Sequence, residues 1–393
     1  MKYLYSVFLF IVFISVPAQK DSTNSDLAFS LQGQYGQMLS TNNYIKELKS
    51  KNFAGISFEV TKQTDGDKMW QQKFGNPSYG VGIYMPDFLQ NKEFGHPVVI
   101  YGNFRGAVKR WNKLEWQYEW GGGFAFNWKP FNVSENYLNP SLGSSTSIYI
   151  NAGTRLQYQL GKHFDLALGV NFNHFSNGAL KMPNKGLNVY SPKISVTYHL
   201  DERNPMKTDF VNSYYDKYHV WEIAAFGGVK NVMYKGYDVD FAKRYEGFYF
   251  SAYGLETVYH RQFTFKSALG LGVGLHYDGE YNYSIHAENG ELYQKKNFAH
   301  QKLLLSVFPS YRLMIGDFSV NVQSGFYLFK QKNESNVPEF YQRLGFQYNL
   351  SNKLFVSIGI RAYEFHVADF IEWKLGYTLD RKRIKRKNSG AVM

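Results

Sequence analysis

Apolar side chains recur at every second position along most of the chain. A period of two is typical of β-strands that bury or expose one apolar face. Glycine and small or polar residues fill the positions between, and the apolar rows end in aromatic residues. This combination is typical of membrane-barrel strands, which have an apolar outer band, aromatic girdles and a polar interior. Two clear rows are Phe265, Ser267, Leu269, Leu271, Val273, Leu275 and Tyr277, and Tyr118, Trp120, Gly122, Phe124, Phe126 and Trp128.

About eight such strands precede residue 201, and about eight more follow between residues 218 and 379. The sequence therefore predicts an all-β fold, an outer-membrane antiparallel β-barrel with sixteen strands in all. Two tandem eight-stranded units or one barrel of about 14–16 strands would both fit. The polar segment 201–217 is long for a periplasmic turn and favours two units. The first eight strands are expected near residues 27–40, 53–63, 78–89, 97–110, 114–129, 147–160, 164–177 and 189–200.

The two halves of the chain also resemble each other in sequence. Residues 156–170 align without gaps to residues 346–360, and Gln, Tyr, Leu and Gly coincide at four positions. This match indicates a duplication, although barrel strands resemble one another in any case. We therefore expect a first barrel at 19–205, a linker at 206–217, a second barrel-like half at 218–379 and a basic tail at 380–393.

Residues 1–18 have the features of a secretory signal peptide. Lys2 precedes an apolar run from Tyr3 to Val16, and a small-residue cleavage site ends at Ala18. The chain has no cysteine, so a closed sheet or a lipid environment, not disulfides, must stabilise the exported protein. After Val16 no stretch reaches the ~18 apolar residues that a membrane helix requires.

The formal net charge of +12 narrows the choice of partners. An exported chain rarely meets nucleic acid, so no nucleic-acid partner is expected. Anionic lipid head groups of the outer membrane fit the charge better. Alternatively, the charge only keeps long loops soluble. A homodimer is compatible with these features, and no cofactor or metal is expected.

The strand near 164–177 carries two reactive side chains on its apolar face. His174 and Ser176 continue the row that begins at Phe164, and residues two apart on a strand lie about 6.5–7 Å apart on one face. A histidine can span that distance and accept the serine proton. If the chain starts in the periplasm, the seventh strand ends at the outer membrane surface, where the pair would meet a lipid. The plainer interpretation is two interfacial polar residues that cap the apolar band.

The segment from His174 to Asn188 resembles the active-site segment of the lipid A 3-O-deacylases of the PagL type. Their pattern is His-x-Ser-Asn, a short loop, Pro-Asn-x-Gly and a polar residue that opens the last strand. The resemblance implies that Ser176 is the nucleophile, that His174 is the general base, and that Asn177 and Asn184 lie near the oxyanion. It also implies lipid A of lipopolysaccharide as the substrate. The matching residues are His174, Ser176, Asn177, Pro183, Asn184 and Gly186.

The chain departs from that family at the third catalytic position. Asn188 stands where the family has a glutamate, and no Asp or Glu occurs between Leu166 and Leu200. An amide can hold a histidine tautomer, as in Cys–His–Asn enzymes, but it cannot balance an imidazolium by charge. Either Asn188 is the third member of the triad, or a carboxylate from another strand serves.

The second half lacks this chemistry. The offset of 190 places Glu364 and His366 where the first half has His174 and Ser176, and no Pro-Asn-x-Gly segment follows. We interpret it as a barrel or docking partner of the first half. The sequence thus predicts an outer-membrane serine esterase that removes an ester-linked acyl chain from lipid A. The alternative is a non-enzymatic barrel, either a pore or a scaffold.

Overall fold

The computed structural model describes residues 26–89, 92–203, 209, 213–233, 246–285, 292–294, 303–330 and 337–384. The predicted signal peptide lies outside the described residues, as do part of the predicted linker and residues 385–393 of the predicted tail. No helix among the described residues is long and apolar enough to span a bilayer.

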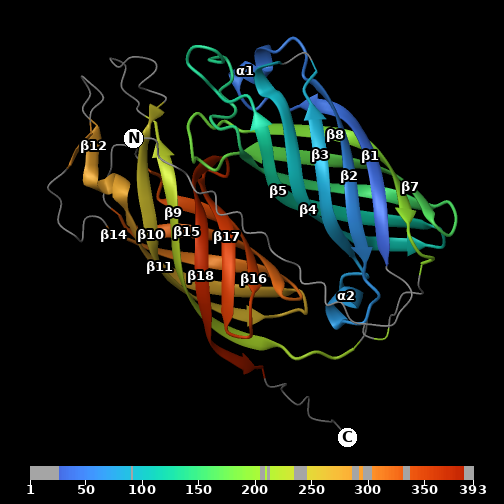
Figure 1. Cartoon of the computed structure of the whole chain (residues 1–393). Helices are drawn as coiled ribbons and strands as arrows, with labels where there is room; N and C mark the ends of the chain where they lie inside the picture. The colour runs from blue at the N-terminus through green and yellow to red at the C-terminus, as the bar shows by residue number, and fades with distance from the viewer. Residues whose placement is uncertain are drawn as a thin grey trace, which may run out of the picture.

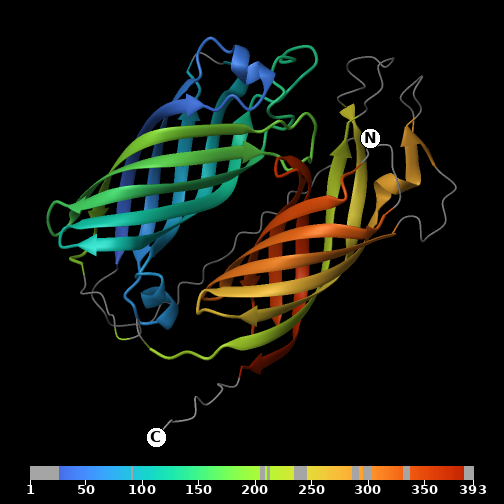
Figure 2. The ribbon, with the colours of Figure 1, turned by 180° about the vertical axis from the view of Figure 1, so that it is seen from behind.

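The described chain forms two closed antiparallel barrels that lie side by side (Figures 1 and 2). In the first barrel neighbouring strands follow chain order, and β1 pairs with β8 to close the sheet. Closure satisfies every strand edge, which a lipid environment demands. The prediction of two eight-stranded units is confirmed, and one larger barrel is not formed. The strands are β1 (Leu27–Met38), β2 (Asn52–Gln63), β3 (Ser78–Asp87), β4 (Gly95–Trp111), β5 (Leu114–Trp128), β6 (Ser147–Gln159), β7 (Phe164–Ser176) and β8 (Leu187–His199).

The second barrel also has eight strands, and β9 pairs with β18 to close it. Its last strand continues to Arg383, so residues 380–383 of the predicted tail are strand. The strands β12 (Tyr283–Ile285) and β13 (Leu292–Gln294) form a separate hairpin. The barrel strands are β9 (Tyr218–Val232), β10 (Phe248–Gln262), β11 (Ser267–Asp278), β14 (Leu303–Ile315), β15 (Phe318–Phe329), β16 (Phe340–Asn349), β17 (Leu354–Tyr363) and β18 (Val367–Arg383).

The two similar sequence segments occupy equivalent places in the two barrels. Residues 156–170 span the β6–β7 hairpin, and residues 346–360 span the β16–β17 hairpin. Each hairpin joins the sixth and seventh strands of its barrel, as a duplication requires. Short helices lie in the connections between strands: α1 (Asn43–Glu47), α2 (Met69–Lys73), and the 3₁₀ turns η1 (Lys92–Phe94) and η2 (Gly279–Asn282).

Side chains alternate between an apolar outer face and a polar interior, as the sequence predicts. On β7 the outward residues Leu168, Val170 and Phe172 are 61%, 56% and 40% exposed. Inside the first barrel, Arg105 pairs with Glu59 and Glu119, and Glu119 also pairs with Lys193. These buried charges satisfy one another, so the interior is a packed polar core.

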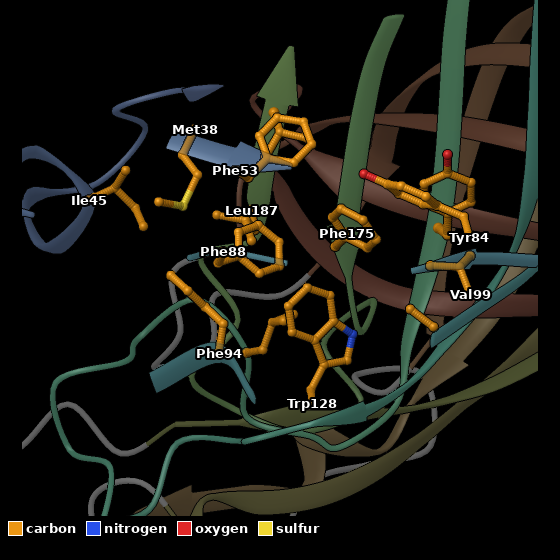
Figure 3. Packing of buried hydrophobic residues seen from close by; sticks show 14 of the residues in the cluster. Met38, Ile45, Phe53, Tyr84, Phe88, Phe94, Val99, Trp128, Phe175 and Leu187 are labelled. Carbon is orange, nitrogen blue, oxygen red and sulfur yellow. The ribbon is translucent and has the colours of Figure 1, made fainter. Parts of the chain in front are cut away.

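Trp128 is an exception to the predicted outward row of β5. Its side chain is buried in the barrel, and its Nε1 donates a hydrogen bond to Ser147 Oγ at 3.0 Å. The cause is Asn127, whose φ of 65° lies in the left-handed region and breaks the alternation of the strand. Trp128 therefore joins the aromatic core that fills the outer end of the first barrel (Figure 3).

The barrels meet through aromatic side chains of β5 in the first barrel and of β15 and β16 in the second. Trp120, on the outer face of β5, stacks on Phe318 and Phe346 of the second barrel, with ring centroids 5.9 Å and 6.4 Å apart. Phe74, which directly follows α2, joins the same apolar cluster as Ile315. This contact removes large aromatic surfaces from the lipid, so it fixes one end of the seam between the barrels.

Candidate active site

The barrel wall brings the three predicted catalytic side chains together on its outer face. His174 and Ser176 lie two residues apart at the end of β7, and the strand register places Asn188 of β8 opposite His174. His174 Nδ1 lies 2.6 Å from Asn188 Oδ1, and His174 Nε2 lies 3.0 Å from Ser176 Oγ. The three groups thus form a continuous hydrogen-bonded chain.

The chemistry of Asn188 determines which ring nitrogen carries the proton. An amide oxygen only accepts hydrogen bonds, so His174 Nδ1–H donates to Asn188 Oδ1. His174 Nε2 is then free of hydrogen and accepts the hydroxyl proton of Ser176. Both ring nitrogens have partners, and no carboxylate of the described residues contacts either one. Among the described residues, the hydrogen-bond partner of His174 Nδ1 is thus Asn188 and not an acid from another strand.

The residues that alternate with the catalytic ones anchor the site from inside. Phe175 points inward, is fully buried and lies with its ring centroid 5.0 Å from that of Trp128 and 5.2 Å from that of Tyr149. Leu187, beside Asn188, is fully buried in the same cluster (Figure 3). Because neighbouring side chains on a strand face opposite sides, this packing fixes the outward direction of the catalytic side chains.

The loop 177–186 connects β7 to β8 and is held by hydrogen bonds within the loop and to residues outside it. The Asn177 backbone N–H donates to Asn184 Oδ1 at 3.0 Å, and Asn177 Nδ2 donates to the Lys181 carbonyl at 2.6 Å. Gly186 has a φ of 69°, and its N–H donates to the Ser141 carbonyl at 3.0 Å. Since Oδ1 of Asn184 is engaged, its amide is oriented with Nδ2 left to donate elsewhere.

Sequence reasoning missed two supports of this loop. Ser141 lies in the segment between β5 and β6, and Asn231 lies in the second barrel, where its side chain accepts a hydrogen bond from the Met182 N–H. Neither residue belongs to a motif or to an apolar row that ends beside the site. No sequence signal marks them.

The described residues of the second barrel form no corresponding site. Glu364 and His366 lie in the turn that joins β17 to β18, and both are exposed. His366 Nδ1 contacts the Glu364 carbonyl and no serine hydroxyl. The turn spans residues 364–366, compared with the ten residues 177–186 of the first barrel, so the long β7–β8 loop has no counterpart between β17 and β18.

Comparison with known proteins finds a matching protein family for each half of the chain. Residues 54–197 match the family described as lipid A 3-O-deacylase (PagL), and residues 219–382 match the family described as acyloxyacyl hydrolase, C-terminal domain. The chain belongs to the PagL family of acyloxyacyl hydrolases. As a PagL-family protein it is an acyl ester hydrolase of the outer membrane. No curated protein sequence matches the chain.

Several solved outer-membrane structures are similar to parts of this PagL-family chain. The outer membrane enzyme PagL is 21% identical with a TM-score of 0.30, over 42% of this chain and 97% of that one. Neisserial surface protein A (NspA) is 12% identical with a TM-score of 0.31, over 46% of this chain and 100% of that one. The siderophore receptor PirA from Acinetobacter baumannii is 12% identical with a TM-score of 0.23, over 88% of this chain and 69% of that one.

We expect the Phe175→Ala substitution to lower both stability and activity. Removing a fully buried phenylalanine costs about 3–5 kcal/mol and leaves a cavity directly behind the catalytic residues. The melting temperature from heat-modifiable gel migration and the rate of ester hydrolysis by the folded protein would both fall.

The matched control is Phe308→Ala, because Phe308 is equally buried inside the second barrel. It should lower stability to a similar extent while the folded fraction keeps its hydrolysis rate. Equal loss of rate in both variants would show that Phe175 does not anchor the site.

Proposed function

We propose that this protein is a serine esterase that removes an ester-linked acyl chain from lipid A, with Ser176 as the nucleophile. The observation that carries the proposal is the hydrogen-bonded chain of Ser176, His174 and Asn188 on the outer face of the barrel. A lumenal reaction would require these groups to face inward. The match to the lipid A 3-O-deacylase family supports lipid A as the substrate.

The reaction proceeds through an acyl-enzyme. Ser176 Oγ attacks the ester carbonyl while His174 Nε2 takes the hydroxyl proton. The tetrahedral intermediate collapses, the C–O bond to the sugar breaks, and the leaving oxygen takes the proton back from Nε2. Water then attacks the acyl-serine with the same base, releasing a fatty acid. Asn188 keeps Nδ1 protonated throughout.

The loop supplies the environment for the oxyanion. Asn177 and Asn184 are both near this position, with different tasks. The Asn177 N–H binds Asn184 Oδ1 and so turns the Asn184 amide, whose Nδ2–H then donates to the oxyanion. Donors fixed before the reaction stabilise the developing charge without further reorganisation.

The outer face of β7 suits the acyl chain. Phe172, Val170 and Leu168 form an exposed apolar row directly beneath His174 on the same face. A chain that extends from the ester carbonyl into the bilayer would lie along this row. The scissile ester and the catalytic residues then share one depth in the outer leaflet.

The alternative of a pore is not favoured. The first barrel is filled by buried ion pairs, such as Arg105 with Glu59, and by the aromatic core at its outer end.

The predicted homodimer stays a prediction.

The Ser176→Ala variant should fold normally and have no deacylase activity. The hydroxyl is lost at the interface, which costs little stability, whereas the covalent route is removed. Mass spectrometry of lipid A from cells that express each variant measures the outcome, and heat-modifiable migration reports folding. Ser145→Ala, which removes an exposed hydroxyl near the same end of the barrel, should keep full activity.

Two results would contradict the proposal in different ways. Lipid A left unchanged by the unmodified protein would refute the substrate, and normal deacylation by Ser176→Ala would refute the nucleophile.

Substitutions at Asn188 should separate orientation from charge. Asn188→Glu keeps an acceptor for Nδ1–H and adds a charge that stabilises the imidazolium, so its activity should equal or exceed that of the unmodified protein. Asn188→Leu leaves Nδ1 without a partner, and loss of efficient general-base catalysis should lower kcat by about 10²–10⁴-fold. Both variants are assayed on one lipid A substrate. If Asn188→Leu keeps the normal rate and Asn188→Glu is slower, Asn188 is not the third member of the triad.

A further inference from the structure

The second barrel contacts the active-site loop of the first barrel directly. Asn231, near the end of β9, makes two hydrogen bonds to the loop. Its backbone N–H donates to the Ala179 carbonyl at 2.9 Å, and its side-chain Oδ1 accepts from the Met182 N–H at 3.1 Å. The two bonds hold the loop at Ala179 and at Met182, which are three residues apart.

The loop is also seated on the outer wall of the second barrel. A Cβ placed on Gly178 would lie 2.5 Å from Ile371 Cγ1 and 3.1 Å from Ile360 Cδ1. Ile371 occupies an outward position of β18 yet is only 7% exposed, whereas the next outward residues, Trp373 and Leu375, are 53% and 59% exposed. The loop therefore covers an apolar patch that would otherwise face lipid. Only glycine fits at 178, where φ is 61° and the wall is this close.

A series of hydrogen bonds and adjacent residues connects Asn231 to the amide of Asn184, the proposed oxyanion donor. Met182 follows Lys181, whose carbonyl accepts the hydrogen bond from Asn177 Nδ2. Asn177 in turn fixes the amide of Asn184 through its N–H. A shift of the loop at Met182 would break these hydrogen bonds and change the orientation of the Asn184 amide. The His174–Ser176 pair would stay in place, since β7 and the aromatic core hold it.

We propose that the second barrel completes the active site of the first, with Asn231 as a positioning residue that sets the Asn184 amide through the loop. This inference rests on the proposed serine-esterase function. It assigns a role to a half that has no catalytic motif of its own. It also places the seam between the barrels beside the reacting ester, so the second barrel forms one wall of the substrate's surroundings.

The test is a double-mutant cycle in the full-length chain with purified lipid A in detergent micelles. Asn231→Ala removes the side-chain acceptor and keeps the backbone bond. We expect kcat to fall about ten- to a hundredfold, because small misplacement of a stabilising group has effects of this size, while KM changes little. Asn184→Ala should lower kcat by a larger factor, and the double variant should lose no more than Asn184→Ala alone.

A second variant and a control keep the outcome independent of folding. Ile371→Ala weakens the contact between the loop and the outer wall of the second barrel and leaves the interior of that barrel unchanged, so the variant should fold. Its smaller loss of kcat should also vanish in the Asn184→Ala background. Asn321→Ala removes a comparably buried asparagine from the interior of the second barrel and should leave kcat unchanged.

The possible results separate this inference from the proposed function. An inactive unmodified protein, or an active Ser176→Ala variant, refutes the function and with it this inference. With the function intact, an unchanged kcat in both Asn231→Ala and Ile371→Ala refutes the positioning role. Losses that multiply with that of Asn184→Ala refute it as well, because they would show that the second barrel acts on another group.

Discussion

The whole site depends on one constraint: in a regular barrel strand such as β7, successive side chains face the interior and the lipid in turn. Phe175 is buried among aromatic rings, so His174 and Ser176 on either side of it must point outward. Cross-strand pairing then puts Asn188 beside the histidine without any further support. The outward position of the proposed nucleophile follows from the anchoring of one inward ring, so the candidate site needs no opening through the buried polar core of the barrel.

Much of the fold, and the meeting of the three side chains of the candidate site, could be predicted because both depend on local features of the sequence. Period-two rows identify strands, and a polar segment too long for a turn separates two sets of eight. The pairing of His174 with Ser176 depends only on their spacing, and that of Asn188 only on a hairpin. The roles proposed for these residues come from the resemblance of the segment 174–188 to the PagL deacylases and stay a proposal.

The period-two rows of apolar residues do not reveal local breaks in a strand or contacts between the two barrels. Trp128 faces inward because Asn127 adopts a left-handed backbone conformation. A polar residue at one strand position does not by itself predict this conformation. The contacts of Asn231 and Ile371 with the loop connect the outer walls of two separate barrels. An outward apolar residue has the same signature whether lipid or protein covers it, so neither periodicity nor spacing could reveal that seam.

The seating of the loop on Ile371 also affects how substrate arrives. A lipid held in one leaflet diffuses in two dimensions, so it can approach the serine only along directions that the protein leaves open within that plane. The second barrel closes one flank and the first closes the rear. Fewer directions of approach therefore remain than for a single barrel, and under the proposed function the encounter rate depends on the lateral mobility of the leaflet. A stiffer, more ordered leaflet would slow turnover even with every catalytic contact unchanged.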